Sequence, residues 1–408
     1  MSSKMGIWRW ALASAVLVMA GTASARVIDP IGVTTNESTA IVLYPKLTVD
    51  LSQGIDTVIQ LTNTSEFLTK VHCFYTNANG HCSNNELQVC TPENASSVCA
   101  LGGVCLPGWQ ETDFRLTLTK RQPISWSIND GLSSLPLADL PGQGNPPQFN
   151  EGNIPAVPEV PFIGELLCIQ VDVTTEEPSD RNDLKGEAVT VKTSGPAIDV
   201  AKYNAIGIKA IEGRQDANPG VLNIGGPEAE YGVINEAVDP GYTGCPNVLT
   251  LNHYFEGANV ITHEGAVSGE VNSVLTIVPC ERDYLFQTAN APGATIQFLI
   301  YNEFEQRFSA STHLDCYKQT RLAEIDTRPG PDGDAFSIFS VGTQGTLTGM
   351  SRLRSVAGPN VDGYDARGIL AVLTENWDRE GGGTATTDSN VQFQGSRPQG
   401  DRILIPLP

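Results

Sequence analysis

Short runs of apolar residues, many alternating with polar ones, recur along most of the chain and are bounded by Gly, Pro, Asn and Asp. Alternation of this kind has the period of a half-buried β-strand, and the bounding residues are typical of turns. After residue 25, almost no window of twelve or more residues has the caps and the 3.6-residue period of a helix. The pattern therefore predicts an all-β protein, with its clearest strands at 40–44, 57–61, 114–118, 166–171, 273–278 and 295–301.

The stretch 184–210 is similar to the stretch 347–371. Both begin with Leu-x-Gly, reach Gly-Pro after 11 residues and an Asp after 15, at Asp199 and Asp362, and a two-residue gap aligns the remainder. Identities at equal offsets indicate an internal duplication. Glycines recur at matched places in the two copies and predict backbone bends or positive φ angles there: Gly186, Gly207, Gly349 and Gly368.

The duplication predicts two tandem β-sandwich domains of the immunoglobulin or fibronectin kind, at 34–212 and 246–378. We expect an acidic linker rich in Gly and Pro between them, 213–245, and a polar tail with a candidate last strand after them, 379–408. The first copy is longer by an insertion rich in cysteine and proline, which we place at 76–163. Because function tends to lie in loops presented by a rigid frame, we expect this insertion to be the distinguishing surface.

Residues 1–25 have the features of a secretory signal peptide. Lys4 and Arg9 precede a short apolar run, and Ala23-Ser24-Ala25 forms a small-residue cleavage site. The apolar run is about half of the ~20 residues needed to cross a bilayer, and no later run approaches that length. We therefore expect an exported chain without a transmembrane anchor, located in the periplasm, at the cell surface or outside the cell.

Nine cysteines in an exported chain are expected to form disulfides. No C-x-x-C pair occurs, which removes the usual signature of a thioredoxin-like redox site, a c-type haem or a ribbon-type zinc site. We expect Cys73 to pair with Cys168 and Cys280 with Cys316, leaving Cys245 odd, while another pairing of the last three stays open. Two bridges are expected within a short segment that contains four cysteines: Cys82, Cys90, Cys99 and Cys105.

Composition narrows the class of partner. Hydrophobic residues make up 40% of the chain, enough to fill folded cores, and the formal net charge is −21. A field of this sign repels phosphate backbones and anionic membrane surfaces, so we expect no nucleic-acid partner. An unidentified protein or glycan at the cell surface is the partner that fits both the charge and the export signal.

Signatures of enzymes are scarce in this sequence. It lacks G-x-S-x-G, H-E-x-x-H, a Walker phosphate loop and G-x-G-x-x-G, and none of its five histidines pairs with another at metal-ligand spacing. Glu303 and Glu305 alternate and could form the carboxylate pair of a glycoside hydrolase, although a hairpin turn explains Asn302 and both acids equally well. A secreted, polysaccharide-directed hydrolase is therefore the alternative to a binding role, and we assign no catalytic residue.

Two acidic loops are candidate calcium sites, because calcium prefers several oxygen ligands and is abundant outside cells. One contains Asp326, Asp332 and Asp334, and the other spans 172–187. Neither loop has the EF-hand pattern. A solvated acidic loop explains the same residues, so no cofactor is assigned and calcium stays an alternative.

Trp109 and Trp377 lie near loop edges and are candidates for stacking against a ligand such as a sugar. Trp126 alternates with polar residues in 123–128 and is expected in a sandwich core. Taken together, the sequence predicts a secreted, acidic, disulfide-stapled β-sandwich protein. We expect it to have a binding, adhesion or structural role at the cell envelope or outside the cell.

Overall fold

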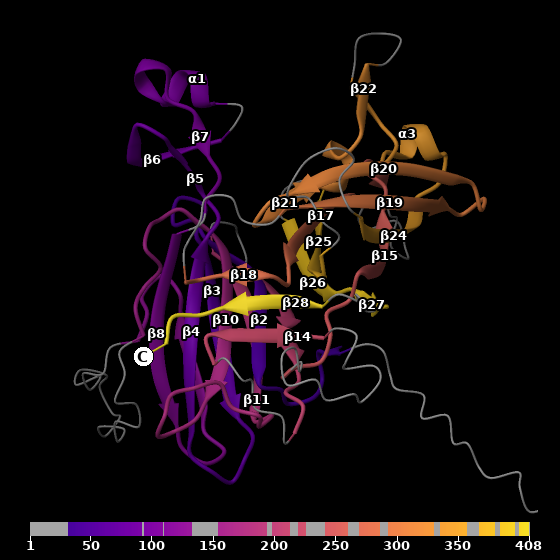
Figure 1. Ribbon diagram of the computed structural model, residues 1–408. Helices are drawn as coiled ribbons and strands as arrows, with labels where there is room; N and C mark the ends of the chain where they lie inside the picture. Colours follow the sequence, from indigo (N-terminus) through magenta and orange to yellow (C-terminus); the bar gives the residue numbers. More distant parts are fainter. Residues whose placement is uncertain are drawn as a thin grey trace, which may run out of the picture.

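Strands dominate the computed structural model of this chain (Figure 1), which confirms the prediction of an all-β protein. The helices within the described residues are single turns, α1 (Ala95–Val98) and α3 (Val341–Gln344), together with two 3-10 turns. None of them is long or apolar enough to span a membrane. The structure describes residues 32–91, 94–108, 110–132, 154–193, 198–212, 219–225, 241–259, 269–285, 293–329, 335–356, 367–379, 384–395 and 400–407.

Two antiparallel sheets pack against each other in the first half of the chain, and we call them the first sheet pair. The larger sheet has the strand order β1-β13-β2-β10-β4-β8, and the smaller has the order β12-β11-β3-β9. Their strands are β1 (Val33–Thr34), β2 (Ile41–Val49), β3 (Ile55–Asn63), β4 (Thr69–Asn77), β8 (Gln110–Leu118), β9 (Pro123–Ser127), β10 (Phe162–Val171), β11 (Leu184–Lys192), β12 (Asp199–Asn204) and β13 (Ile206–Ile208).

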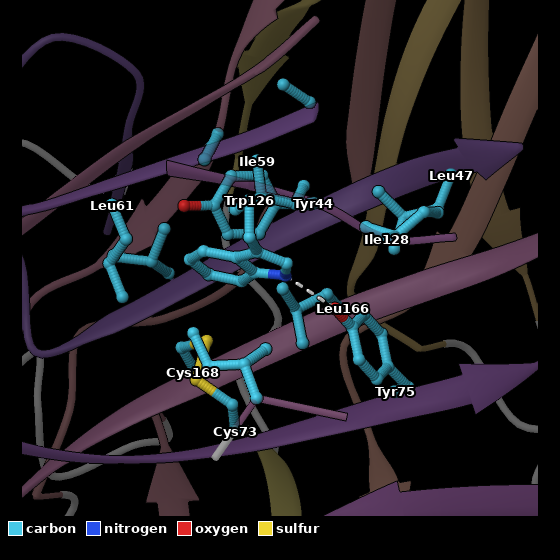
Figure 2. Packing of buried hydrophobic residues seen from close by; sticks show 14 of the residues in the cluster. Tyr44, Leu47, Ile59, Leu61, Cys73, Tyr75, Trp126, Ile128, Leu166 and Cys168 are labelled. Atoms are coloured by element: carbon cyan, nitrogen blue, oxygen red, sulfur yellow. Dashed lines mark hydrogen bonds between the residues drawn. A yellow bond between two sulfur atoms is a disulfide. The ribbon is translucent and has the colours of Figure 1, made fainter. Parts of the chain in front are cut away.

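The core of the first sheet pair is built around Trp126, which is 3% exposed. Figure 2 shows its indole lying between the two sheets, where Nε1 donates a hydrogen bond of 2.7 Å to the hydroxyl of Tyr75. The Cys73–Cys168 disulfide joins the adjacent strands β4 and β10 beside this ring. Trp126 is therefore a core residue, as the alternating pattern predicted, and its one polar atom has a partner.

The strands β2, β4 and β10 of the larger sheet are buried on both faces. The outer face of this sheet is covered by three short strands, β14 (Val221–Ile224), β28 (Asp401–Leu404) and β18 (Arg282–Asp283), which form a sheet in the order β14-β28-β18. Phe74 on β4 stacks on Tyr284 just after β18, with ring centroids 4.4 Å apart. Burial of both faces explains why β2, β4 and β10 are nearly continuous apolar runs rather than alternating ones.

The second half of the chain forms another two facing sheets, the second sheet pair. One has the order β20-β19-β24-β15-β27, and the other has the order β16-β17-β25-β26 with β21 also pairing with β17. A small two-stranded sheet, β22-β23, accompanies them. The strands are β15 (Val248–Tyr254), β16 (Ala258–Asn259), β17 (Gly269–Pro279), β19 (Ala294–Asn302), β20 (Arg307–Leu314), β21 (Lys318–Arg321), β22 (Thr327–Pro329), β23 (Ala335–Ser337), β24 (Thr348–Val356), β25 (Ile369–Arg379), β26 (Thr384–Asn390) and β27 (Gln392–Gln394).

A buried ion pair joins the two halves of the chain. Arg282 on β18 donates from Nε and Nη2 to the two carboxylate oxygens of Glu165 on β10, each at 2.6 Å. The side chains are 0% and 1% exposed. Nη1 of Arg282 donates to the backbone carbonyls of Pro279 and Glu281. The pair is surrounded by the apolar cluster that β18, β28 and the outer face of the larger sheet share, so it lies inside the contact between the halves.

The structure contains four disulfides. Cys73 bonds to Cys168, and the four cysteines of the short segment pair as Cys82–Cys99 and Cys90–Cys105. The expected pair of Cys280 with Cys316 is corrected, because Cys280 bonds instead to Cys245 and Cys316 is the free, buried cysteine. All three lie in one apolar cluster, so position along the chain could not distinguish between the partners.

The matched glycines are needed for close packing rather than for positive φ. None of Gly186, Gly207, Gly349 and Gly368 has a positive φ angle. A Cβ atom on Gly186 would lie 1.9 Å from the hydroxyl of Tyr44, and one on Gly349 would lie 2.4 Å from the ring of Phe255. In each of the two similar stretches, the missing side chain leaves room for an aromatic ring.

Candidate functional site

The segment 80–106 forms a small module, here called the knob, which projects from one end of the first sheet pair (Figure 1). It contains α1 and a sheet of three short strands in the order β6-β5-β7: β5 (Gly80–Cys82), β6 (Asn85–Cys90) and β7 (Cys105–Leu106). So short a segment buries too little apolar surface to fold by itself. Its buried cluster consists of Cys82, Cys90 and Cys99, so the two disulfides supply most of the stability of its folded state.

A half-buried carboxylate anchors the base of the knob. Glu159 accepts hydrogen bonds from the amides of Asn77 at 2.7 Å and Asn79 at 2.6 Å, and lies 3.0 Å from Nε2 of His81. Burial opposes ionisation of Glu159, but these hydrogen bonds outweigh it, and the pKa of the carboxyl lies below its usual value. No pattern in the sequence predicted this cluster. The alternate spacing of Asn77, Asn79 and His81 is the one feature of the sequence that could have indicated a shared polar face. Glu159 lies 78 residues beyond His81, so no local pattern connects it to them.

The surface of the knob presents exposed apolar side chains among polar ones and carries little charge. Leu87 is 92% exposed, Val104 57% and Leu106 44%. The segment has no Lys, Arg or Asp, and Glu86 and Glu93 are its two acids, in a chain of net charge −21. Exposed large apolar side chains on a rigid projection are typical of interaction surfaces.

A pocket of about 290 Å³ lies between the knob and the second half of the chain. Its lining includes the Cys90–Cys105 disulfide and Leu106 from the knob, and Asp315 and Cys316 from the turn after β20. Burial raises the pKa of the Cys316 thiol to about 12, so this thiol stays protonated at neutral pH. The pocket therefore contains no activated nucleophile among these residues.

The carboxylates considered for glycoside hydrolysis lie in a hairpin turn between β19 and β20. Glu303 accepts hydrogen bonds from the backbone NH of Thr348 at 3.0 Å and from its hydroxyl at 2.8 Å. These bonds hold the pKa of Glu303 below its usual value, the opposite of what a general acid needs. Glu305 has a positive φ of 61° in the same turn, so the geometry favours a turn role for both acids.

Several acids of the loop 172–187 have partners from the protein itself. Asp172 accepts bonds from the backbone NH groups of Thr174 and Thr175, and Glu176 forms an ion pair of 3.0 Å with Lys70. Asp326 precedes β22, whereas Asp332 and Asp334 lie outside the described residues. Within the described ranges, the one group of side chains with metal-ligand proximity is Cys82, Cys90 and Cys99, whose sulfurs belong to the disulfides of the knob.

Of the two tryptophans considered for ligand stacking, the structure describes one. Trp377 lies on β25, half-buried, with its ring 5.2 Å from the ring of Tyr254 in an edge-on arrangement. Its indole thus packs partly against its own sheet pair. Trp109 lies outside the described residues.

No family model matches this sequence, and no curated protein matches it. The comparison with solved structures includes a lectin from Pleurotus ostreatus in its apo form, 10% identical over 90% of this chain and 81% of the lectin. The TM-score is 0.14, too low to indicate a shared fold. The four disulfides of an all-β chain fit an exported protein with a structural or binding role.

Proposed function

We propose that this chain is an exported, disulfide-stapled binding protein that contacts a protein or glycan at the cell surface through its knob. The observation that carries the proposal is the solvent exposure of Leu87 on a module locked by two disulfides. A rigid projection loses little conformational entropy when it binds, so its exposed side chains can contribute most of their contact energy to affinity. The export step is assigned to the signal peptide 1–25.

The strand pairings of the two sheet pairs support an origin by duplication of one β-sandwich unit. In the first sheet pair, β11 pairs with β3 and with β12, and β13, the strand after β12, pairs with β2 in the opposite sheet. In the second pair, β24 pairs with β19 and the following β25 crosses to pair with β17. Within the described residues, these pairings place corresponding strands of the two similar stretches at matching positions, which supports the proposed duplication. The knob belongs to the insertion that makes the first copy longer.

The test is the binding of purified, fluorescently labelled protein to the surface of the cells that produce it. We expect Leu87→Ser to weaken binding roughly tenfold, the usual cost of losing a central apolar contact. The matched control is Leu51→Ser, because Leu51 is also exposed, at 59%, but lies in the turn between β2 and β3.

Equal loss in the two variants would mean that general surface hydrophobicity, not the knob, drives attachment. Unchanged binding of Leu87→Ser, or no saturable binding of the unmodified protein, would refute the proposed role of the knob. Circular dichroism and melting temperature of each variant establish that the fold is retained.

A further inference from the structure

A cleft lined by both polar and apolar side chains lies where the two sheet pairs meet. Its volume is about 250 Å³, and its walls come from β2, β3, β11 and β12 on one side and from β17, β21, β25 and β26 on the other. Ligand sites occur preferentially at such boundaries between folded units, because both surfaces contribute groups.

One wall of the cleft rests on a buried ion pair that crosses the boundary. Lys46 on β2 donates from Nζ to Oδ1 of Asp388 on β26 at 2.6 Å, and the two side chains are 8% and 0% exposed. The hydroxyl of Thr374, which lines the cleft, donates to the same oxygen. The other carboxylate oxygen of Asp388 is buried and has no hydrogen-bond partner among the described residues.

Two further buried polar atoms at the cleft have no partner within the described part of the chain. They are Oγ1 of Thr190 on β11 and Oδ2 of Asp199 on β12, and both residues line the cleft. Buried polar atoms in native proteins nearly always have a partner, so the two orphaned atoms of cleft-lining residues call for a ligand or solvent that hydrogen-bonds to them.

The charges around the cleft balance. Lys46 is offset by Asp388, and Lys192 lies directly across the strand pair from Asp199. A simple anion would be repelled by the two carboxylates, and a simple cation by the two ammonium groups. Hydroxyl groups both donate and accept, so they match carboxylate oxygens and ammonium groups at once.

We propose that this cleft binds a neutral, polyhydroxylated small molecule of about the size of a monosaccharide. The volume is slightly below the range of sites for drug-sized ligands, which begins at about 300 Å³. Asp199 accepts from the ligand's hydroxyls, Thr190 donates to or accepts from them, and Lys192 donates to them. This site is separate from the knob, and either could exist without the other.

The test is isothermal titration of the full chain with glucose, galactose, mannose, N-acetylglucosamine and myo-inositol, with glucuronate and glucosamine as charged counterparts. We expect saturable binding of at least one neutral probe and weaker binding of its charged counterparts. Asp199→Asn and Thr190→Val should each reduce affinity about tenfold, the cost of losing one hydrogen bond to a buried polar group.

The control variant is Glu86→Gln, which also removes one negative charge but lies on the exposed surface of the knob. It should bind the probe as the unmodified chain does. If none of the neutral probes binds, if the charged probes bind equally well, or if both cleft variants retain full affinity, the proposed site is refuted. Melting curves of the variants separate a lost ligand contact from a lost fold.

Discussion

At the scale of single residues, His253 shows how burial alone produces a pH dependence. It lies on β15, 2% exposed, with Nδ1 3.3 Å from the carbonyl of Tyr254 and Nε2 2.8 Å from the hydroxyl of Ser351. A carbonyl can only accept, so Nδ1 carries the proton and Nε2 accepts from Ser351. Burial lowers the pKa of His253 to about 4, because the charged imidazolium would be poorly solvated.

The folded-state pKa of His253 is below the unfolded value of 6.5, so the unfolded chain binds the proton first as the pH falls. Folding stability should therefore be fully present above pH 6.5 and should decline between about pH 6.5 and 4, by about 2–4 kcal/mol from this residue. Urea unfolding at several pH values measures this decline.

The variant His253→Asn should unfold with a shallower pH dependence over the same window. Exposed His313→Asn serves as the matched control and should retain the original slope. A slope that is identical in the unmodified chain and in His253→Asn would contradict the assignment.

At the scale of elements, the knob depends on covalent links, whereas the strands beneath it depend on packing. Its buried cluster contains only cysteines, while the first sheet pair buries Trp126, Tyr75 and many aliphatic side chains. The knob and the sheet pairs should therefore lose structure independently.

Replacing one bridge of the knob, as Cys82→Ala with Cys99→Ala, should unfold the knob without unfolding the sheets. A bridge that closes a loop of this length contributes about 3 kcal/mol, comparable with all the stability that a module so small can have. Hydrogen exchange read by mass spectrometry should show lost protection in 80–106 and unchanged protection in β2 and β10. Loss of protection in both regions would show that the knob is needed for the fold of the sheets.

At the scale of the whole molecule, the halves are joined by buried charge as well as by apolar contact. Arg282 and Glu165 are fully desolvated in the contact, and their attraction must offset the cost of removing both charges from water. Such a pair contributes more to the alignment of the halves than to net stability. The apolar cluster around it provides the larger favourable term.

Arg282→Met should destabilise the protein by about 3–5 kcal/mol, because it leaves the carboxylate of Glu165 buried without an opposite charge beside it. The double variant Arg282→Met with Glu165→Leu should recover most of that loss, since it removes both buried charges. Urea unfolding of both variants measures the two changes. A double variant as unstable as the single one would show that the pair itself, rather than the orphaned charge, accounts for the effect.

The knob and the contact between the halves were predictable to different degrees. The close spacing of Cys82, Cys90, Cys99 and Cys105 placed two bridges in one segment, because a short loop limits the choice of partners. The partner of Cys280 was predicted wrongly, because Cys245 and Cys316 both reach the same apolar cluster and only the path of the chain distinguishes them.

The sequence by itself determined that this protein is built from strands, since the two-residue period and the turn residues act locally. It also placed Trp126 in the core for the same reason. Only the tertiary structure decided which of the matched glycines lie against an aromatic ring. It also decided that Glu159 anchors the knob and that Lys46 forms an ion pair with Asp388. These contacts join residues far apart along the chain, and their geometry depends on how the sheets pack, which no local pattern of apolar and polar residues encodes.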